Sequence, residues 1–546
     1  MTTVSETPPV TLPADDASGR DDLLDQARHR GPLGRAAIYT RLSGPGWLQG
    51  AITLGGGSLA GALYLGVLVG YDLMWLQPLA MILGVIMLSA ISYVALSTGQ
   101  RPFQTLRVHI SPVLAWGWLI ATIMANIVWS LPQFALGTAA VQQNLLPSLT
   151  GTGGQIAIAA ALLVVASVVV WFYNSGSRGI AAFEIILKVM VGIVVLSFFG
   201  VVAAMTRSGV LQWGEILSGL VPRVRYLFEP VPTMAAPIAA TGENAAWWTD
   251  VIAGKQKDTI ITAFATAVGI NMTFLLPYSM LRKGWGRKHR GLAIFDLSIG
   301  LIVPFVLATS CVVIAAASQF HARSDDVMAM VQSGESTKEV AAYNDALAKL
   351  RDAGRNVTAG DEKLAAMLAG RDNLSLAETL SPLVGDAVAQ KLFGIGVLGM
   401  ALSTIIILMV INGFAVCELV GAELDSTTHR LGSFLPAIGV LGPFVWGAAA
   451  PALALPTSVF NGAMLPIAYL SFWLLMNSRS ALGDAIPTGG RAIVWNLLMG
   501  TATAAATFAS IWGLTGKGWV GYLGIFAIAI MLVLGIVGYI RKHRHA

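Results

Sequence analysis

The sequence predicts an all-α polytopic membrane protein with about twelve transmembrane helices. Of the 546 residues, 55% are hydrophobic and only 12% are charged, and the mean hydropathy is +0.70. Such a chain is too apolar to cover the surface of a soluble protein. Apolar runs of about 20 residues, the length that crosses a bilayer as a helix, recur along most of the chain. Because these runs are continuous and do not alternate with polar residues, they predict helices and not a β-barrel.

The apolar runs divide into two groups of five and a final pair. The expected spans are 47–69, 73–97, 111–136, 155–173 and 180–204, then 258–281, 292–318, 389–417, 433–451 and 456–477, and last 491–514 and 519–540. Lys and Arg gather in alternate connections, as in Arg282-Lys283 after the sixth span, whereas the connections at 142–154 and near 452 carry neither. The positive-inside rule then predicts a multi-pass protein of a bacterial-type inner (plasma) membrane with both termini in the cytoplasm.

Polar segments separate these groups. Residues 1–43 are polar and have no apolar stretch after a basic start, so we expect a disordered cytoplasmic tail and no cleavable signal peptide. The membrane parts are expected at 44–204, 258–318, 389–477 and, with a basic tail, 478–546, and the hydrophilic connections 205–257 and 319–388 are expected outside the membrane. Helix-like stretches such as Lys338–Arg351 occur in the second connection. We interpret both connections as a cover or an oligomer contact, with a substrate-capturing lid as the alternative.

The remaining composition excludes several function classes. The net charge of +5 comes from basic residues in short loops, which fix membrane orientation and do not indicate a nucleic-acid partner. Cys311 and Cys417 both lie in apolar runs and are expected to pack in the interior. We find no nucleotide-binding loop, metal-ligand spacing or catalytic triad. The sequence therefore predicts neither an enzyme nor a bound cofactor, and its expected partners are the lipid bilayer and a small ion or molecule.

Two spans carry signals for an interrupted helix. Span 1 contains Gly55-Gly56-Gly57-Ser58 near its middle, and each glycine costs about 1 kcal/mol relative to alanine in a helix. Span 6 contains Pro277 together with several polar residues, and proline removes a helical hydrogen bond. Interrupted helices at matching positions of two halves expose backbone groups inside the membrane and are the best sequence pointer to a transport site.

Several short motifs, in this order and spacing, resemble a known family. These are Gly44-Pro45-Gly46, Gly70-Tyr71 with Leu73-Met74-Trp75, Arg178 followed by Glu184, Leu276-Pro277-Tyr278-Ser279 and Leu465-Pro466. They resemble the Nramp family of divalent-metal transporters. The resemblance implies the LeuT-type fold of two inverted five-helix repeats, here followed by two C-terminal helices. It also implies transport by alternating access through a site between broken helices 1 and 6.

The resemblance implies where the site residues lie. The expected substrate-binding residues are Gly55, Gly57, Ser58, Asn271, Thr273, Leu276, Tyr278 and Ser279, and the expected pathway residues are Asn126, Gln133, Asn412 and Ser458. Interhelical hydrogen bonding is the alternative role for the pathway residues. Glu184 and Lys188 lie four apart on one helix face and are expected to pair.

The chain departs from the family at the metal ligands. The helix 1 Asp and Asn of the family fall on Gly55 and Ser58, and its helix 6 Met and first His fall on Leu276 and Tyr278. The metal ligands are therefore unknown. Family resemblance predicts transport of a cation, a divalent metal by descent. The alternatives are transport of a small organic solute such as an amino acid, whose carboxylate would bind at a helix N-terminus, or a non-transporting protein that retains the fold. The oligomeric state does not follow from the sequence.

Overall fold

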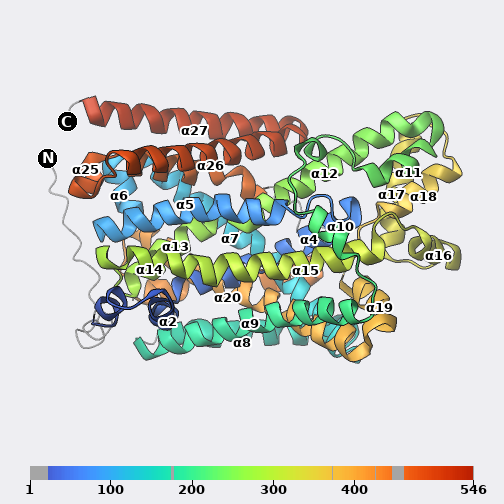
Figure 1. Cartoon of the computed structure of the whole chain (residues 1–546), viewed down its shortest axis with the longest axis horizontal. Helices are drawn as coiled ribbons and strands as arrows, with labels where there is room; N and C mark the ends of the chain where they lie inside the picture. Colours follow the sequence, from blue (N-terminus) through green and yellow to red (C-terminus); the bar gives the residue numbers. More distant parts are fainter. Residues whose placement is uncertain (1–21, 174–176, 372, 425, 446–459, 545–546) are drawn as a thin grey trace.

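The computed structural model describes residues 22–173, 177–371, 373–424, 426–445 and 460–544, and every regular element in these ranges is helical. Its long helices run roughly side by side (Figure 1). The first group contains α3 (Pro45–Thr53), α4 (Gly56–Val69), α5 (Leu76–Thr98), α7 (Pro112–Ala140), α8 (Gly151–Tyr173) and α9 (Ser177–Arg207). The second contains α12 (Ala245–Ala267), α13 (Ile270–Arg282), α14 (Arg290–Leu297), α15 (Val303–Phe320), α20 (Phe393–Val420), α22 (Gly442–Val445) and α24 (Leu465–Met476). α26 (Gly490–Thr515) and α27 (Gly518–Arg544) follow.

Shorter elements connect the long helices. They are α2 (Pro32–Leu42), α6 (Pro102–His109), α10 (Trp213–Ser218), α11 (Ala235–Ala239), α16 (Asp325–Ser333), α17 (Lys338–Asp352), α18 (Ala359–Met367), α19 (Asn373–Val384), α21 (Thr427–Gly432) and α25 (Arg479–Leu482). Short π-helical turns continue α7 (Val141–Leu145), join α14 to α15 (Ser298–Ile302) and precede α20 (Ala387–Leu392).

The all-α prediction is confirmed, with differences in detail. Among the described residues, nine helices are long and apolar enough to cross a membrane, or ten if α3 and α4 count as one span, so the expected count of twelve is not reached there. The segment expected as a single span over 433–451 contains a 3₁₀ helix (Leu435–Leu441) and the short α22 before it leaves the described residues. The sixth helix begins at Ala245 and not at 258, because the polar start of α12 packs against the outer segments.

The tail prediction is wrong for the part of the tail that is described. Residues 22–28 and 32–42 are helical, and the side chains of Leu24 and Ala27 are buried. The helix α2 begins with a proline at its first turn, where the missing N–H costs nothing. Residues 1–21 lie outside the described part of the chain.

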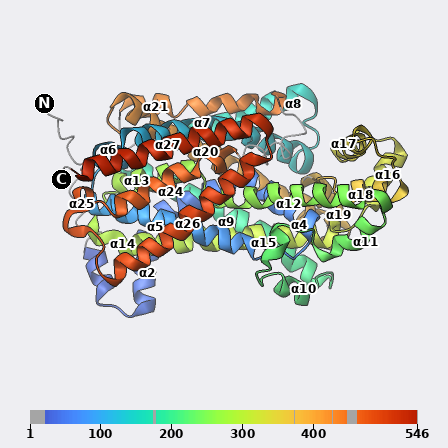
Figure 2. The ribbon, with the colours of Figure 1, turned by 90° about the horizontal axis from the view of Figure 1, so that it is seen from above.

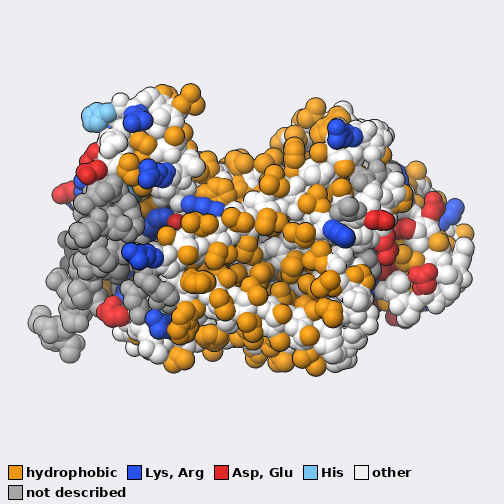
Figure 3. Space-filling model, turned by 90° about the horizontal axis from the view of Figure 1, so that it is seen from below, with side chains coloured by type: hydrophobic (Ala, Val, Ile, Leu, Met, Phe, Trp, Pro, Cys, Tyr) orange, Lys and Arg blue, Asp and Glu red, His pale blue; other side chains and the backbone are white. Residues whose placement is uncertain are grey.

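The outer surface matches a lipid environment. Hydrophobic side chains cover the middle of the molecule, whereas charged side chains concentrate toward its two ends (Figure 3). α27 is an extreme case, because only 6% of its most apolar stretch is buried inside the protein. Leu, Ile, Val and Phe side chains exposed in this way are stable only against lipid or a partner surface.

Small residues let the central helices approach closely. A Cβ atom added to Gly50 of α3 would lie 2.1 Å from the carbonyl oxygen of Gly300 in the turn between α14 and α15. A Cβ at Gly66 of α4 would lie 2.7 Å from the carbonyl oxygen of Val313 in α15. Both contacts exclude any side chain, as is common where membrane helices cross.

The two long hydrophilic connections pack against each other at one end of the molecule. α11, α16, α17 and α18 gather there in both views, opposite to α2 and α25 (Figures 1 and 2). The buried carboxylate of Asp361 in α18 accepts hydrogen bonds from Trp248 Nε1 at 2.7 Å and from Asn244 Nδ2 at 2.9 Å. Asp361 therefore joins the insertion 319–388 to the start of α12.

Candidate functional site

The first break separates α3 from α4. The two helices are bent by 52°, and Leu54 and Gly55 between them leave the helical conformation. The Gly55 N–H donates to Ser58 Oγ at 3.1 Å, and the Ser58 hydroxyl donates to the Gly55 carbonyl oxygen at 2.9 Å. Ser58 thus caps the N-terminus of α4.

The second break separates α12 from α13. Val268 and Gly269 are extended, and α13 starts at Ile270. We expected this break near Pro277, but Pro277 lies inside α13. The position of the break is set by Gly269, because a Cβ there would lie 2.6 Å from the side chains of both Asn271 and Asn461. The helix tolerates Pro277 at the cost of one backbone hydrogen bond.

Hydrogen bonds join the two breaks. The Thr53 hydroxyl, on the last residue of α3, lies 2.8 Å from the Thr266 carbonyl oxygen and 2.7 Å from that of Ala267 at the end of α12. The Ile270 N–H at the start of α13 donates to Asn461 Oδ1 at 3.3 Å. The ends of four half-helices therefore meet at one place inside the protein.

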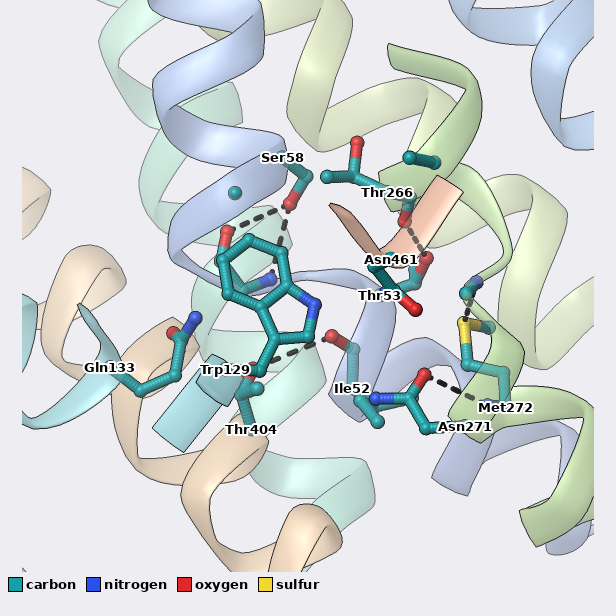
Figure 4. Close-up of a pocket in the computed structure, with 14 residues that line it drawn as sticks. Ile52, Thr53, Ser58, Trp129, Gln133, Thr266, Asn271, Met272, Thr404 and Asn461 are labelled. Atoms are coloured by element: carbon teal, nitrogen blue, oxygen red, sulfur yellow. Dashed lines mark hydrogen bonds between the residues drawn. The ribbon is translucent and has the colours of Figure 1, made fainter. Parts of the chain in front are cut away.

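A small buried pocket lies where the breaks meet (Figure 4). Its volume is about 20 Å³, enough for about one water molecule. It is lined by Ile52, Thr53, Gly55, Gly57, Ser58, Trp129, Gln133, Ala265, Thr266, Gly269, Asn271, Met272, Thr404 and Asn461. None of these side chains carries a charge, and the described residues contain no group of three His, Cys, Asp or Glu side chains that could hold a metal ion.

The hydroxyl groups of the pocket have already used their protons. Thr53, Ser58, Thr266 and Thr404 each donate to backbone carbonyl oxygens at 2.7–2.9 Å. A hydroxyl has one proton and two lone pairs, so toward the pocket these groups can only accept hydrogen bonds or coordinate a cation.

The two carboxamides present the opposite polarity. Gln133 Oε1 accepts from the Gly56 N–H at 2.9 Å, and Asn271 Oδ1 accepts from the Met272 N–H at 2.9 Å. These bonds fix the orientation of both amides. Gln133 Nε2 and Asn271 Nδ2 are buried and have no hydrogen-bond partner among the described residues.

The predicted site residues divide into two sets. Gly55, Gly57, Ser58, Gln133 and Asn271 line the pocket. Gly57 is needed because a Cβ there would lie 2.2 Å from the Trp129 ring.

The other predicted residues lie elsewhere. Leu276, Tyr278 and Ser279 lie further along α13 and do not line the pocket. Tyr278 is fully buried, with its ring stacked on Phe274 at 4.6 Å. Thr273 also lies off the pocket and accepts a hydrogen bond from Trp118 Nε1 at 2.8 Å. Leu276 and Tyr278, which were expected at ligand positions, therefore lie away from the helix break.

The predicted pathway residues also divide, because Gln133 lines the pocket whereas Asn126 and Asn412 do not. Asn126 Nδ2 donates to Asn412 Oδ1 at 2.8 Å and ties α7 to α20, which is the alternative role of interhelical hydrogen bonding. Ser458 lies outside the described residues.

Sequence reasoning missed several lining residues. They are Thr53, Trp129, Thr266, Met272 and Thr404. A signal existed for Trp129, which lies one turn from Gln133 and on the same face of α7. Thr404 lies in the middle of a long apolar helix, and nothing in its local sequence marks it.

A charged cluster surrounds the N-terminus of α3. Asp296 accepts hydrogen bonds from the N–H groups of Gly44 at 3.1 Å and Gly46 at 2.6 Å. Lys188 Nζ donates to the Ser43 carbonyl oxygen at 2.7 Å. The expected pair of Glu184 with Lys188 is therefore wrong: Glu184 pairs with Lys283 at 2.7 Å, because the end of α13 brings Lys283 to it while Lys188 satisfies a backbone carbonyl.

A larger cavity opens at the end that carries the hydrophilic segments. Its volume is about 560 Å³, and its charged lining residues are Asp72, Glu215, Arg223 and Arg323, with His321 beside them. Asp72 pairs with Arg223 at 2.9 Å. Burial lowers the pKa of His321 below its usual range, so this side chain is neutral near pH 7.

Apolar helices across the whole molecule and two helix breaks that meet at a buried polar pocket are typical of an integral, multi-pass transport protein. The family model of natural resistance-associated macrophage protein-like (Nramp) proteins matches residues 46–359 and 364–516. The chain therefore belongs to the Nramp family.

Known proteins resemble the chain in sequence and in structure. The Metal transporter Nramp2 of Populus trichocarpa is 28% identical over 185 residues, which cover 33% of this chain and 32% of the relative. The match thus spans about a third of the relative's length. The crystal structure of the Eremococcus coleocola manganese transporter, in complex with an aromatic bis-isothiourea substituted compound, has a TM-score of 0.63 at 13% identity, covering 93% of this chain and 96% of that one. The H236A mutant of that transporter matches equally well. This similarity confirms the predicted fold class.

Proposed function

We propose that the protein is a secondary transporter that moves a metal cation by alternating access through the pocket between its two broken helices. The observation that carries this proposal is the meeting of four half-helix ends at one buried polar pocket. Half-helix ends expose backbone dipoles inside a membrane, and rocking one group of helices against the other opens such a site to alternate sides. Membership of the Nramp family makes a metal ion the first substrate to test.

The pocket supplies neutral ligands to this cation. The hydroxyl oxygens of Thr53, Ser58 and Thr404 and the carbonyl oxygen of Ile52 carry lone pairs that a hard cation prefers. Met272 also lines the pocket, but its sulfur accepts from the Gly269 N–H at 3.3 Å. Because none of the described lining side chains supplies negative charge, we expect the cation to keep part of its water shell.

The orientation is part of the same proposal. The end of the molecule that carries α2, α25 and the basic C-terminal end of α27 is assigned to the cytoplasm of a bacterial-type inner membrane, following the positive-inside rule. The segments 205–257 and 319–388 then form an extracytoplasmic cover, held together by Asp361. In this orientation the charged cluster around Asp296 closes the cytoplasmic side.

A second candidate is transport of a small organic solute with a carboxylate group, such as an amino acid. The specific observation in its favour is the pair of unpartnered amide NH₂ groups on Gln133 and Asn271. Hydrogen-bond donors stabilise a carboxylate and oppose a bare cation.

The test is manganese uptake into proteoliposomes. The native protein is compared with a variant that restores the family's helix 1 ligands, Gly55→Asp with Ser58→Asn. A Cβ at Gly55 would lie 2.5 Å from Thr404 Oγ1, so Thr404→Ala is added to make room. We expect saturable uptake by the native protein and a lower KM in the variant. Glycine uptake without manganese uptake by the native protein would favour the organic solute instead, and uptake of neither would favour a non-transporting protein.

A further inference from the structure

The two carboxamides of the pocket lack an acceptor. Gln133 and Asn271 are 1% and 2% exposed, and their oxygens are held by backbone N–H groups at 2.9 Å. Their amide nitrogens lie on the side that faces the other lining residues (Figure 4). Leaving a buried donor without a partner is unfavourable, because the donor has lost its hydrogen bonds to water. Both donors therefore indicate a ligand with lone pairs.

The helix ends that begin at the breaks have the same polarity as these donors. α4, with 14 residues, and α13, with 13 residues, both begin at the breaks. The N-terminus of a helix carries a positive partial charge and attracts anions. Among the described residues that line the pocket, none is acidic and could balance these donors.

The pocket also contains groups of the opposite polarity. It contains the carbonyl ends of α3 and α12, represented by Ile52 and Thr266, and the lone pairs of Thr53 and Thr404. These groups attract a cation. The pocket thus combines hydrogen-bond donors with groups that attract a cation.

We infer that the pocket binds a small oxyanion, a carboxylate or bicarbonate, through Gln133 and Asn271, and that this oxyanion supplies the negative charge for a cation held by the acceptor groups. The inference rests on the proposed function, because it concerns the substrate of the same pocket. The oxyanion comes either from a free anion that accompanies the metal ion or from the carboxylate of an organic solute whose ammonium group is the cation. Both sources share one recognition chemistry.

The size of the pocket sets a condition. Its volume of about 20 Å³ is enough for about one water molecule. A carboxylate needs more room, so the pocket must widen to admit it. Trp129 forms part of the wall and packs against Gly57, so any widening on this side requires the Trp129 ring to move.

The experiment uses two isosteric changes, Asn271→Asp and Gln133→Glu. In each variant, one carboxylate oxygen still accepts the backbone N–H and the other places a negative charge in the pocket. The matched control is Asn496→Asp in α26, where the carboxamide bonds to Asn477 and Ala492 and does not line the pocket. Manganese uptake is measured in proteoliposomes with buffer free of carboxylates and bicarbonate, and again with bicarbonate, acetate or glycine.

The inference predicts anion-dependent uptake. Bicarbonate or acetate is expected to raise uptake by the native protein and by Asn496→Asp about tenfold. Asn271→Asp and Gln133→Glu are expected to take up manganese without any added anion. If the oxyanion belongs to an organic solute, glycine is taken up without manganese by the native protein, and both pocket variants lose this uptake.

Two results would overturn the inference. Native uptake that is independent of every anion, together with unchanged uptake by both pocket variants, would refute it and leave the proposed function intact. If manganese and glycine uptake are both absent, the proposed function fails, and thermal stabilisation of the purified native chain by acetate, bicarbonate and glycine then decides the matter. Stabilisation that Asn271→Asp and Gln133→Glu abolish would support the oxyanion site, whereas no stabilisation, or equal stabilisation of the variants, would refute it.

Discussion

The carboxylate of Asp296 holds the N-terminus of α3 against α14. Its two oxygens accept from Gly44 N–H at 3.1 Å and Gly46 N–H at 2.6 Å, and the side chain is 1% exposed. In an alternating-access cycle α3 must leave this position for the pocket to open on that side. Replacing Asp296 by Asn is therefore expected to favour the open conformation.

The magnitude follows from the two hydrogen bonds. A bond to a charged acceptor contributes about 1.5–3 kcal/mol and a neutral one about 0.5–1.5, so neutralisation costs roughly 1 kcal/mol per bond. An asparagine also turns an NH₂ group toward one of the two backbone donors. The total of about 2 kcal/mol corresponds to a shift of about 30-fold in the equilibrium between closed and open conformations.

The assay is thiol labelling of a cysteine at position 51. Ala51 of α3 is fully buried, so the variant Ala51→Cys reacts only when α3 moves. Cys311 and Cys417 are replaced by alanine first. The labelling rate with a small hydrophilic reagent is then measured with and without Asp296→Asn, and an increase of about 30-fold is expected when opening is fast compared with labelling.

A matched control removes a charge elsewhere. Asp258 bridges to Lys517 at 3.2 Å on an exposed part of α12 and contributes little, so Asp258→Asn should leave the labelling rate unchanged. Equal labelling of Asp296→Asn and the native protein would show that the carboxylate does not hold α3 closed.

Three further predictions concern the outer segments, the pocket and the charged cluster. Burial raises the pKa of Asp361, but hydrogen bonds, including those from Trp248 and Asn244, outweigh burial and hold the pKa below its usual range. The Asp361 carboxylate therefore stabilises the fold fully above its unfolded-state pKa near 4. This stabilisation is lost as the pH falls through the lower pKa of the folded state. Asp361→Asn should cost about 2 kcal/mol, seen as faster hydrogen exchange in α18 at pH 7 and no difference from the native protein at low pH. Gly57→Ala should abolish uptake because its Cβ meets Trp129, and adding Trp129→Leu should restore it; no loss of uptake would contradict the tight packing. Glu184→Gln breaks the pair with Lys283 and should lower the melting temperature of the purified protein. If Lys188→Met lowers the melting temperature equally, the Glu184–Lys283 pair is not the main contribution of this cluster to stability.

The sequence predicted the membrane fold because long apolar runs leave few alternatives. α5, α8 and α9 lie close to the expected spans, since each is a continuous apolar helix bounded by glycine, proline or basic residues. The start of α12 was harder to predict. Its first four turns contain charged residues between 250 and 258 and so do not extend the apolar run, and Asp361, more than a hundred residues later, holds their start by accepting from Trp248.

The break in span 1 was predicted better than the break in span 6 for a physical reason. Consecutive glycines weaken a helix wherever they occur, so Gly55–Gly57 mark the first break directly. Pro277 is compatible with a helix that gives up one hydrogen bond, whereas Gly269 breaks α12 from α13 because Asn461 of a distant segment leaves no room for a side chain. A single glycine carries no such information in the sequence alone.

This shift of the second break changes which residues determine the substrate. If the site were centred on Leu276 and Tyr278, it would be apolar and closed by stacked rings. Centred on Gly269, it places Asn271 opposite Gln133, and the pocket gains two hydrogen-bond donors where the family has acidic and sulfur ligands. On the oxyanion inference, the loss of the family's carboxylate at Gly55 and the gain of unpartnered amides are two parts of one change, because the substrate then brings the negative charge that the described lining residues lack.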